Sequence, residues 1–294
     1  MKTINAAVIL RGRDLQSRRL PKTGWWTYPV EGFTWTLYGA DDGSVFYRDK
    51  LAAAGHDVII YEDWQWSAVI GPGLPLVYVI VDSNTSEKRH QWYRRHARGL
   101  GVDLILLDQD KPKRFRDIAP ALHWGYGVNE RVWSEPDTKP VDVAYHCAKT
   151  AERGELGHWL AAFRDAHPQW LFKINSNMPI PEYIQAIRQA KLVVHIPTKP
   201  QCRTHRIFDA LASGGCLLSS VLPTIPGDDF EPGHHYVVWQ DEAMLGRQII
   251  NLLETGTWKH IARQGREFVL SRHTWAHKAA ELHTILGEAF PWLN

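Results

Sequence analysis

The stretch that decides the fold runs from Thr204 to Ser220 and reads Thr-His-Arg-Ile-Phe-Asp-Ala-Leu-Ala-Ser-Gly-Gly-Cys-Leu-Leu-Ser-Ser. Its apolar residues recur at helical spacing as far as Gly214 and Gly215, and a short apolar run follows. A glycine pair is a common helix end, because glycine adopts the left-handed conformation without steric cost. A short buried run after a helix is typical of a strand in a parallel sheet. The stretch therefore predicts a helix that leads into a strand of an α/β domain.

The polar residues of this helix suggest a binding role. Arg206 and Asp209 lie three positions apart near its start, where the helix dipole favours an anion. Thr204 fits the N-cap position, where its hydroxyl would accept a backbone N–H of the first turn. Arginine and backbone N–H groups suit a phosphate, and aspartate suits the hydroxyl groups of a sugar. The alternative is an ordinary surface helix with an Arg–Asp pair.

Length and composition favour a globular protein of more than one domain. The chain has 294 residues, of which 44% are hydrophobic and 22% are charged, and this length favours two domains. No run is long and apolar enough for a membrane span, and the first residues lack the apolar length of a signal peptide. The three cysteines form no C-x-x-C pair, which favours a reducing compartment. We therefore expect a cytoplasmic protein without a membrane partner.

Strand and helix signals alternate along the first half of the chain. The expected strands cover 6–10, 56–61, 76–81 and 103–107, and the expected helices cover 45–54 and 86–98. Such a succession builds a parallel sheet with helices on its faces.

A second alternation follows a polar, proline-bearing stretch at 133–140. Its expected strands cover 141–145, 170–174, 192–196, 216–218 and 235–239, and its expected helices cover 152–167, 181–190, 204–215 and 241–254. Two such units predict an α/β protein with two Rossmann-like, doubly wound domains that face each other across a cleft. We place these domains at 1–135 and 136–275. Residues 276–294 are expected to form a C-terminal helix that packs back on the first domain.

Several short segments of the second half match a known family in the same order. They are Val141–His146, Arg206–Gly215, Phe230–Gly233 and His273–Trp275, and the stretch 124–133 looks like the junction segment of that family. By these segments the chain resembles the nucleotide-sugar-dependent glycosyltransferases of the GT-B type. It is most similar to the CgeB-like members of glycosyltransferase group 1.

The resemblance implies an enzyme that takes a sugar from a nucleoside diphosphate sugar, with a UDP-sugar as the favoured donor and no metal or other cofactor required. Asp209 stands where the family usually carries a glutamate that holds the donor ribose. Gln201 stands where related proteins carry the first glutamate of a Glu-x7-Glu pattern. The other candidate donor ligands, chiefly for the diphosphate, are Arg206, Arg203, Lys199, Lys149, Arg153 and Gly12.

Glycosyl transfer also needs a base, because an acceptor hydroxyl is too weak an acid to attack unaided. Asp82 follows an apolar strand of the first domain and precedes Ser-Asn-Thr. It is therefore the candidate catalytic base. Its alternative role is that of a helix N-cap, for which aspartate is often used.

Positive charge is concentrated in one part of the first domain. Residues 88–116 hold nine basic and three acidic side chains, a net charge of +6, which leaves −4 for the rest of the chain. Cations interleaved with aromatic residues suit a nucleic-acid backbone and its bases. The candidate acceptor-binding residues are Arg89, Trp92, Arg94, Arg95, Arg98, Lys113, Arg114 and Arg116.

We therefore favour double-stranded DNA with a 5-hydroxymethylated pyrimidine, such as 5-hydroxymethylcytosine, as the acceptor. An enzyme of this kind must extrude its target base from the duplex. The alternatives are a protein, small-molecule or cell-surface glycan acceptor, with the basic residues serving solubility. A nucleotide-sugar epimerase and a non-catalytic nucleotide- or DNA-binding protein remain as alternatives on the same scaffold.

Overall fold

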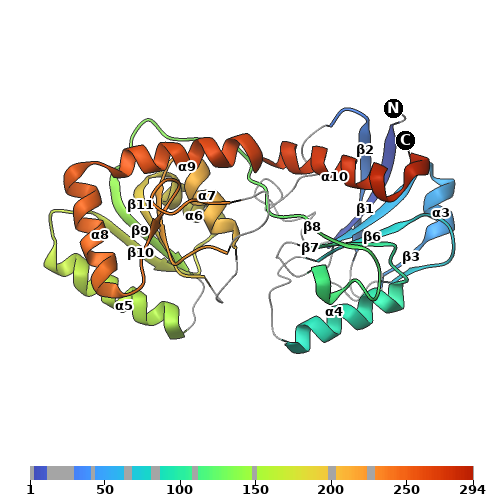
Figure 1. The fold of residues 1–294 in the computed structure, drawn as a ribbon, viewed down its shortest axis with the longest axis horizontal. Helices are drawn as coiled ribbons and strands as arrows, with labels where there is room; N and C mark the ends of the chain where they lie inside the picture. Colours follow the sequence, from blue (N-terminus) through green and yellow to red (C-terminus); the bar gives the residue numbers. More distant parts are fainter. Residues whose placement is uncertain are drawn as a thin grey trace. The chain divides into compact units, whose positions relative to one another are not determined.

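The computed structural model describes residues 3–11, 30–40, 44–62, 68–80, 87–107, 112–147, 151–197, 203–223 and 229–293. The chain forms two compact units (Figure 1). Unit 1 comprises residues 1–127 and 275–294, and unit 2 comprises residues 128–274.

Unit 1 contains a six-stranded parallel sheet with the order β2-β1-β4-β6-β7-β8. Its strands are β1 (Ile4–Arg11), β2 (Phe33–Ala40), β4 (Val58–Glu62), β6 (Leu76–Ile80), β7 (Leu104–Leu107) and β8 (Ala121–His123). The central strands are buried on both faces, as expected for continuous runs of valine, isoleucine and leucine. A smaller parallel pair, β3 (Val45–Tyr47) and β5 (Ala68–Ile70), lies outside this sheet.

Helices cover both faces of the unit 1 sheet. Helix α10 (Trp275–Ala289) packs Ala279, Leu282 and Leu286 against one face. The opposite face is covered by α4 (Glu87–Leu100) and by α3 (Arg48–Ala53). Two short 3₁₀ helices, η2 (Pro112–Arg114) and η3 (Pro291–Leu293), complete the described elements of unit 1. The last helix of the chain is thus part of the first unit.

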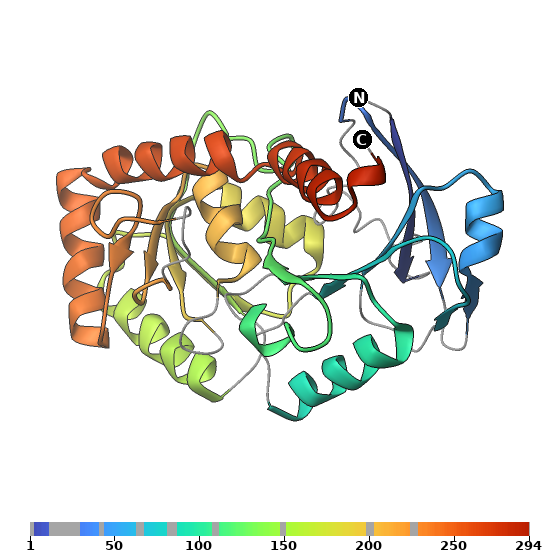
Figure 2. The same ribbon diagram turned by 45° about the vertical axis from the view of Figure 1, so that its right-hand side comes forward.

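Unit 2 contains a five-stranded parallel sheet with the order β10-β9-β11-β12-β13. Its strands are β9 (Val141–Cys147), β10 (Phe172–Ser176), β11 (Ala190–His195), β12 (Cys216–Ser219) and β13 (Val237–Val238). Its helices are α5 (Ala151–Ala166), α6 (Ile180–Arg188), α7 (His205–Ala212), α8 (Glu242–Thr255) and α9 (Trp258–Arg272). Helices α5 and α8 lie on one face of the sheet, and α6 and α7 lie on the other (Figure 2). The predicted α/β class with two parallel sheets is confirmed.

Several elements differ from the expectations drawn from the sequence. Residues 45–54 were expected to be one helix, but they begin as strand β3 and turn into α3 at Arg48. Val45, Phe46 and Tyr47 are β-branched or aromatic residues that favour a strand. Their pairing with β5 stabilises the strand conformation over the helix that was expected. Strands β2, β5 and β8 and helix α9 were not predicted.

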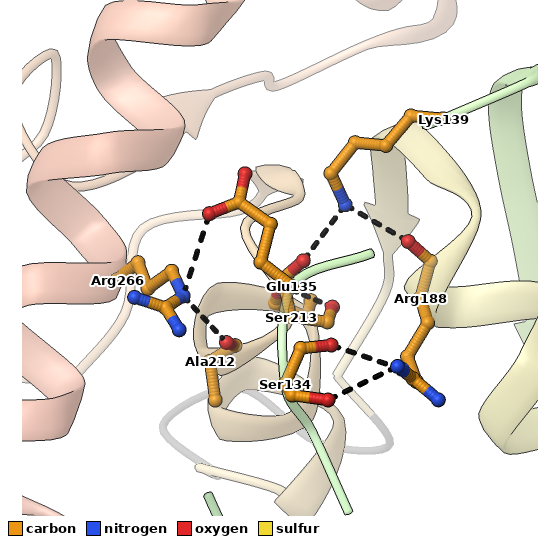
Figure 3. Close-up of polar contacts among 8 residues, drawn as sticks. Ser134, Glu135, Lys139, Arg188, Ala212, Ser213 and Arg266 are labelled. Atoms are coloured by element: carbon orange, nitrogen blue, oxygen red, sulfur yellow. Dashed lines mark hydrogen bonds and ion pairs between the residues drawn. The ribbon is translucent and has the colours of Figure 1, made fainter. Parts of the chain in front are cut away.

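The segment before β9 is held to the amino-terminal edge of the unit 2 sheet (Figure 3). The Lys139 Nζ donates to the carbonyl oxygens of Arg188 (2.9 Å) and Ser213 (2.7 Å), at the ends of α6 and α7. Arg188 in turn donates to Ser134, through Nε to the backbone oxygen and through Nη2 to Oγ. Cations at helix carboxyl ends satisfy the last carbonyl groups and oppose the negative end of the dipole.

A second contact fastens the same segment to the end of α7. Arg266 Nε donates to the Ala212 carbonyl oxygen (3.1 Å) and lies 3.6 Å from Glu135 Oε2. Trp133 is fully buried. Residues 133–135 therefore pack within unit 2, although their sequence led us to expect them in the first domain.

Gly214 is required at the end of α7 for two reasons, which gives a test of this packing. It has φ +70°, and a Cβ there would lie 2.7 Å from the Glu135 side chain. We expect Gly214→Ala to lower the free energy of unfolding by more than the roughly 1–2 kcal/mol that the left-handed conformation alone costs. Denaturant unfolding measures the difference.

The matched control is Gly256→Ala at the end of α8. Gly256 has φ +71°, but a Cβ there would contact nothing within 4 Å. It should therefore show the conformational cost alone. Equal losses in the two variants would contradict the packing of Glu135 against Gly214.

Candidate functional site

The polar residues of unit 2 gather where its strand order reverses. Strand β9 pairs with β10 on one side and with β11 on the other, so that successive crossovers run in opposite directions from β9. Ligands of doubly wound sheets bind outside the carboxyl ends of the strands at this switch point. His146 lies near the carboxyl end of β9, and His195 and Ser219 end β11 and β12 and pair with each other.

His146 is a buried histidine in a neutral state. Its side chain is 2% exposed, and its ring meets that of Tyr183 edge-on at 6.2 Å. Burial, followed by the charges of Arg206 and Lys173, lowers its pKa to about 4. Among the residues that the structure describes, neither ring nitrogen has a hydrogen-bond partner. Because this imidazole offers one donor and one acceptor at the carboxyl edge of the sheet, we take it as a candidate ligand group.

Arg206 stands beside this histidine at the end of a chain of hydrogen bonds. Its guanidinium bonds the Tyr183 hydroxyl, which donates to Asp209 Oδ2 at 3.0 Å. Burial and the Asp209 charge raise the pKa of Tyr183 well above its usual value. The Arg206 Nε is buried and has no hydrogen-bond partner within the described ranges. The structure thus brings Arg206 and Asp209 together as the sequence indicated, and adds His146 and Tyr183.

The start of α7 differs in one respect from the expectation. Thr204 occupies the N-cap position with extended backbone angles, but its side chain makes no capping hydrogen bond. Its hydroxyl lies 3.4 Å from His195 Nε2 instead. The prediction of a hydroxyl cap is therefore wrong, because the buried histidine competes for the same oxygen. The Thr204 side chain therefore satisfies none of the first-turn N–H groups, and only its backbone carbonyl accepts one, from Ile207 (3.0 Å).

Arg203 is positioned for a structural task. Its side chain is 2% exposed, and its Nε and Nη2 donate to the Pro223 carbonyl oxygen at 3.0 and 2.7 Å. Its guanidinium carbon also lies 5.0 Å from the centre of the Phe230 ring. This geometry uses the guanidinium to hold the segment after β12, and its role as a phosphate ligand stays a prediction.

The remaining predicted residues of the donor and catalytic sites lie outside the described residues. These are Gly12, Asp82, Lys149 and Lys199, together with the side chain of Arg153, whose backbone lies in the first turn of α5.

Three arginines of the basic stretch of unit 1 form ion pairs with acidic side chains of the same unit. Arg94 makes two hydrogen bonds to Asp117 (2.8 and 2.5 Å) and a further one to the Arg114 carbonyl oxygen, and Arg98 bonds the same aspartate at 2.8 Å. Arg114 pairs with Glu87 at 3.2 Å. The hydrogen bond from Arg94 is the main reason why the pKa of Asp117 is lowered to about 2. Asp117 follows the basic stretch 88–116 directly, so the net charge calculated for that stretch did not include it.

The other residues predicted for the acceptor have more varied surroundings. Trp92 is partly buried against the core and stacks on His96 with ring centres 4.9 Å apart. The remaining cations are exposed; they are Arg89, Arg95, Lys113 and Arg116.

The described parts of the chain lack a metal-binding cluster and a membrane-spanning helix. They contain no group of three or more His, Cys, Asp or Glu side chains that could hold a metal ion. None of their helices is both long and apolar enough to cross a membrane.

Comparison with known families shows the family of the chain. A family model described as glycosyl transferase-like matches residues 138–284, which is half of the chain and includes every site residue described in unit 2. The chain belongs to this glycosyl transferase-like family. It is a nucleotide-sugar-dependent glycosyltransferase. Among curated proteins, none matches the sequence significantly.

Solved structures extend the likeness over both units. HepE from Anabaena, in complex with UDP and glucose, is 12% identical, with 97% of this chain and 100% of that chain covered and a TM-score of 0.63. A glycosyltransferase from Rickettsia africae is 8% identical (98% and 99% covered, TM-score 0.62). A sucrose-phosphate synthase from Thermosynechococcus elongatus is 10% identical (98% and 100%, TM-score 0.59). At these identities the likeness shows the fold, which is that of the GT-B glycosyltransferases.

The buried neutral state of His146 predicts a loss of stability in acid. Its pKa of about 4 in the folded protein lies below the unfolded value of 6.5, so the unfolded state binds the extra proton first as pH falls from about 6.5 to 4. Over this window His146 should cost the wild type stability of the order of 3 kcal/mol. Urea unfolding at pH 7, 5.5 and 4.5 measures the effect. The loss between pH 7 and 4.5 should be smaller in His146→Leu, and equal losses in both proteins would contradict it.

Proposed function

We propose that this enzyme transfers a sugar from a UDP-sugar, bound at the carboxyl edge of the unit 2 sheet, to a hydroxyl group of a glycan, small molecule or protein. The observation that carries the donor site is the pair formed by His146 and Arg206 at the switch point. Both present buried nitrogen atoms without a hydrogen-bond partner among the described residues. The UDP and glucose in the HepE complex, on the same fold, support the choice of donor.

The site suits the charge that develops during transfer. When the sugar leaves, negative charge grows on the departing diphosphate and must be stabilised. Arg206 supplies a positive charge and hydrogen-bond donors, and the start of α7 supplies backbone N–H groups and a favourable dipole. His146 adds a neutral ring that donates one hydrogen bond and accepts another. We further propose that Lys149, Arg153 and Lys199 contact the diphosphate.

The acceptor is proposed to be other than DNA because three arginines of the basic stretch are paired with acidic side chains of the same unit. Arg94 and Arg98 share Asp117, and Arg114 pairs with Glu87. Binding a phosphate backbone with these three arginines would require breaking those contacts. Hydroxymethylated DNA is therefore the second candidate acceptor, and four exposed cations of the same stretch favour keeping it in the test.

The transfer reaction is tested with a panel of donors and acceptors. The purified protein is incubated with UDP-glucose, UDP-galactose or UDP-N-acetylglucosamine and with glycans, small alcohols, peptides or hydroxymethylated DNA, and mass spectrometry follows the products. A mass gain of one sugar on a non-DNA acceptor supports the proposal. A gain on DNA alone, an altered sugar without any mass gain, or UDP binding without turnover would each contradict it.

Replacing the proposed phosphate ligand should weaken donor binding. Arg206→Ala removes a charged hydrogen bond of the kind that contributes about 1.5–3 kcal/mol, so we expect a rise of about 10- to 100-fold in the Kd for UDP. Isothermal titration calorimetry measures this value. Arg263→Ala, which removes an exposed arginine from α9, is the matched control and should leave the Kd unchanged. Wild-type affinity in Arg206→Ala would overturn the site.

Asp82 is proposed as the base that accepts the proton of the acceptor hydroxyl. Asp82→Asn should keep the Kd for UDP and lower kcat by about 10²- to 10⁴-fold, the usual contribution of a general base. Kinetic assays with the acceptor identified by the panel provide the measurement. A variant that transfers sugar at nearly the full rate would remove Asp82 from this role.

A further inference from the structure

Tyr183 connects the two charged residues of α7 from a neighbouring helix. It lies on α6, and its ring is fixed edge-on against Trp133 (5.8 Å) and His146 (6.2 Å). Its hydroxyl accepts a hydrogen bond from Arg206 and donates one to Asp209. A single hydroxyl group therefore joins the guanidinium to the carboxylate inside unit 2.

Asp209 is buried more deeply than Arg206, whose side chain is partly exposed. The Asp209 side chain is 4% exposed, and its Oδ2 accepts the Tyr183 hydroxyl at 3.0 Å. A buried carboxylate needs such a partner and a nearby positive charge, and Arg206 stands one turn earlier on the same helix. The carboxylate consequently supports the tyrosine and balances the arginine.

We propose that Tyr183 and Asp209 are positioning residues for donor binding, which hold the Arg206 guanidinium in the orientation that meets the donor diphosphate. This inference rests on the proposed function. An arginine side chain loses considerable rotamer freedom when it binds a ligand. Fixing one N–H group on Tyr183 removes part of that cost before the donor arrives, and it aims the remaining donors of the planar group. Asp209 thus acts on the donor through Tyr183.

Asp209 has a shorter side chain than the glutamate that the family usually carries at this position. The resemblance to group 1 glycosyltransferases places a glutamate here as a direct ribose ligand. In this chain the shorter side chain reaches the Tyr183 hydroxyl of the adjacent helix. The pairing of Asp209 with Tyr183 therefore replaces a direct ribose contact in our account.

The test is a double-mutant cycle on Tyr183 and Arg206. Tyr183→Phe keeps the ring packing and removes only the hydroxyl, so we expect the donor KM and the Kd for UDP to rise about 5- to 10-fold, kcat to fall less than 3-fold and Tm to change little. In the Arg206→Ala background the same substitution should change the Kd by less than 2-fold, because the group that it positions is absent.

Two further variants separate positioning from general structural support. Asp209→Asn retains an oxygen that accepts the hydroxyl, and it should keep the Kd nearer to the wild-type value than Asp209→Leu does. Tyr38→Phe, which removes a hydroxyl hydrogen-bonded to His56 in unit 1, should leave the Kd unchanged.

The outcomes distinguish this inference from the proposed function. A wild type that binds no UDP and uses no UDP-sugar would overturn the proposed function, and the inference with it. An active wild type with an unchanged Kd in Tyr183→Phe would overturn the inference alone. An equal loss on Tyr183→Phe with and without Arg206 would also overturn it, since that result indicates a role independent of the arginine.

Discussion

The hydrogen bonds that join Arg206, Tyr183 and Asp209 are the interaction on which the site depends. Helix α7 carries a buried carboxylate, Asp209, one turn after a half-buried cation, Arg206, and a buried charge without a partner is costly. The tyrosine from α6 satisfies the carboxylate and orients the arginine. The apolar side of α7 can then pack on the sheet, and its polar side remains directed to the carboxyl edge where ligands of this fold bind.

The two ends of α7 differ in whether side chains satisfy their terminal backbone groups. At its carboxyl end, Lys139 and Arg266 donate to the last carbonyl groups, and Gly214 turns the chain toward β12. At its amino end, the Thr204 hydroxyl lies near His195 and caps no backbone N–H group. The positive end of the helix therefore keeps its capacity for an anion, whereas the negative end is satisfied within the protein.

Much of this architecture could be predicted from local sequence patterns. The helical spacing and glycine stop after Thr204 located α7, and apolar runs located the central strands of both sheets. Patterns could not reveal contacts between distant residues. Tyr183 reaches Asp209 across 26 positions, Arg203 bonds Pro223 across 20, and Asp117 neutralises Arg94 across 23. These contacts pair charged side chains with groups far away in the sequence, so local patterns located helix α7 but did not show that Arg94 and Arg98 are paired with Asp117.

The central claim is that the donor diphosphate binds Arg206 and His146 at the switch point of the unit 2 sheet. A crystal structure of the protein with UDP tests it most directly. The account predicts phosphate oxygens within about 3 Å of the Arg206 guanidinium and the His146 ring, with the Tyr183 hydrogen bonds retained. UDP bound elsewhere, with neither side chain in contact with it, would contradict the account.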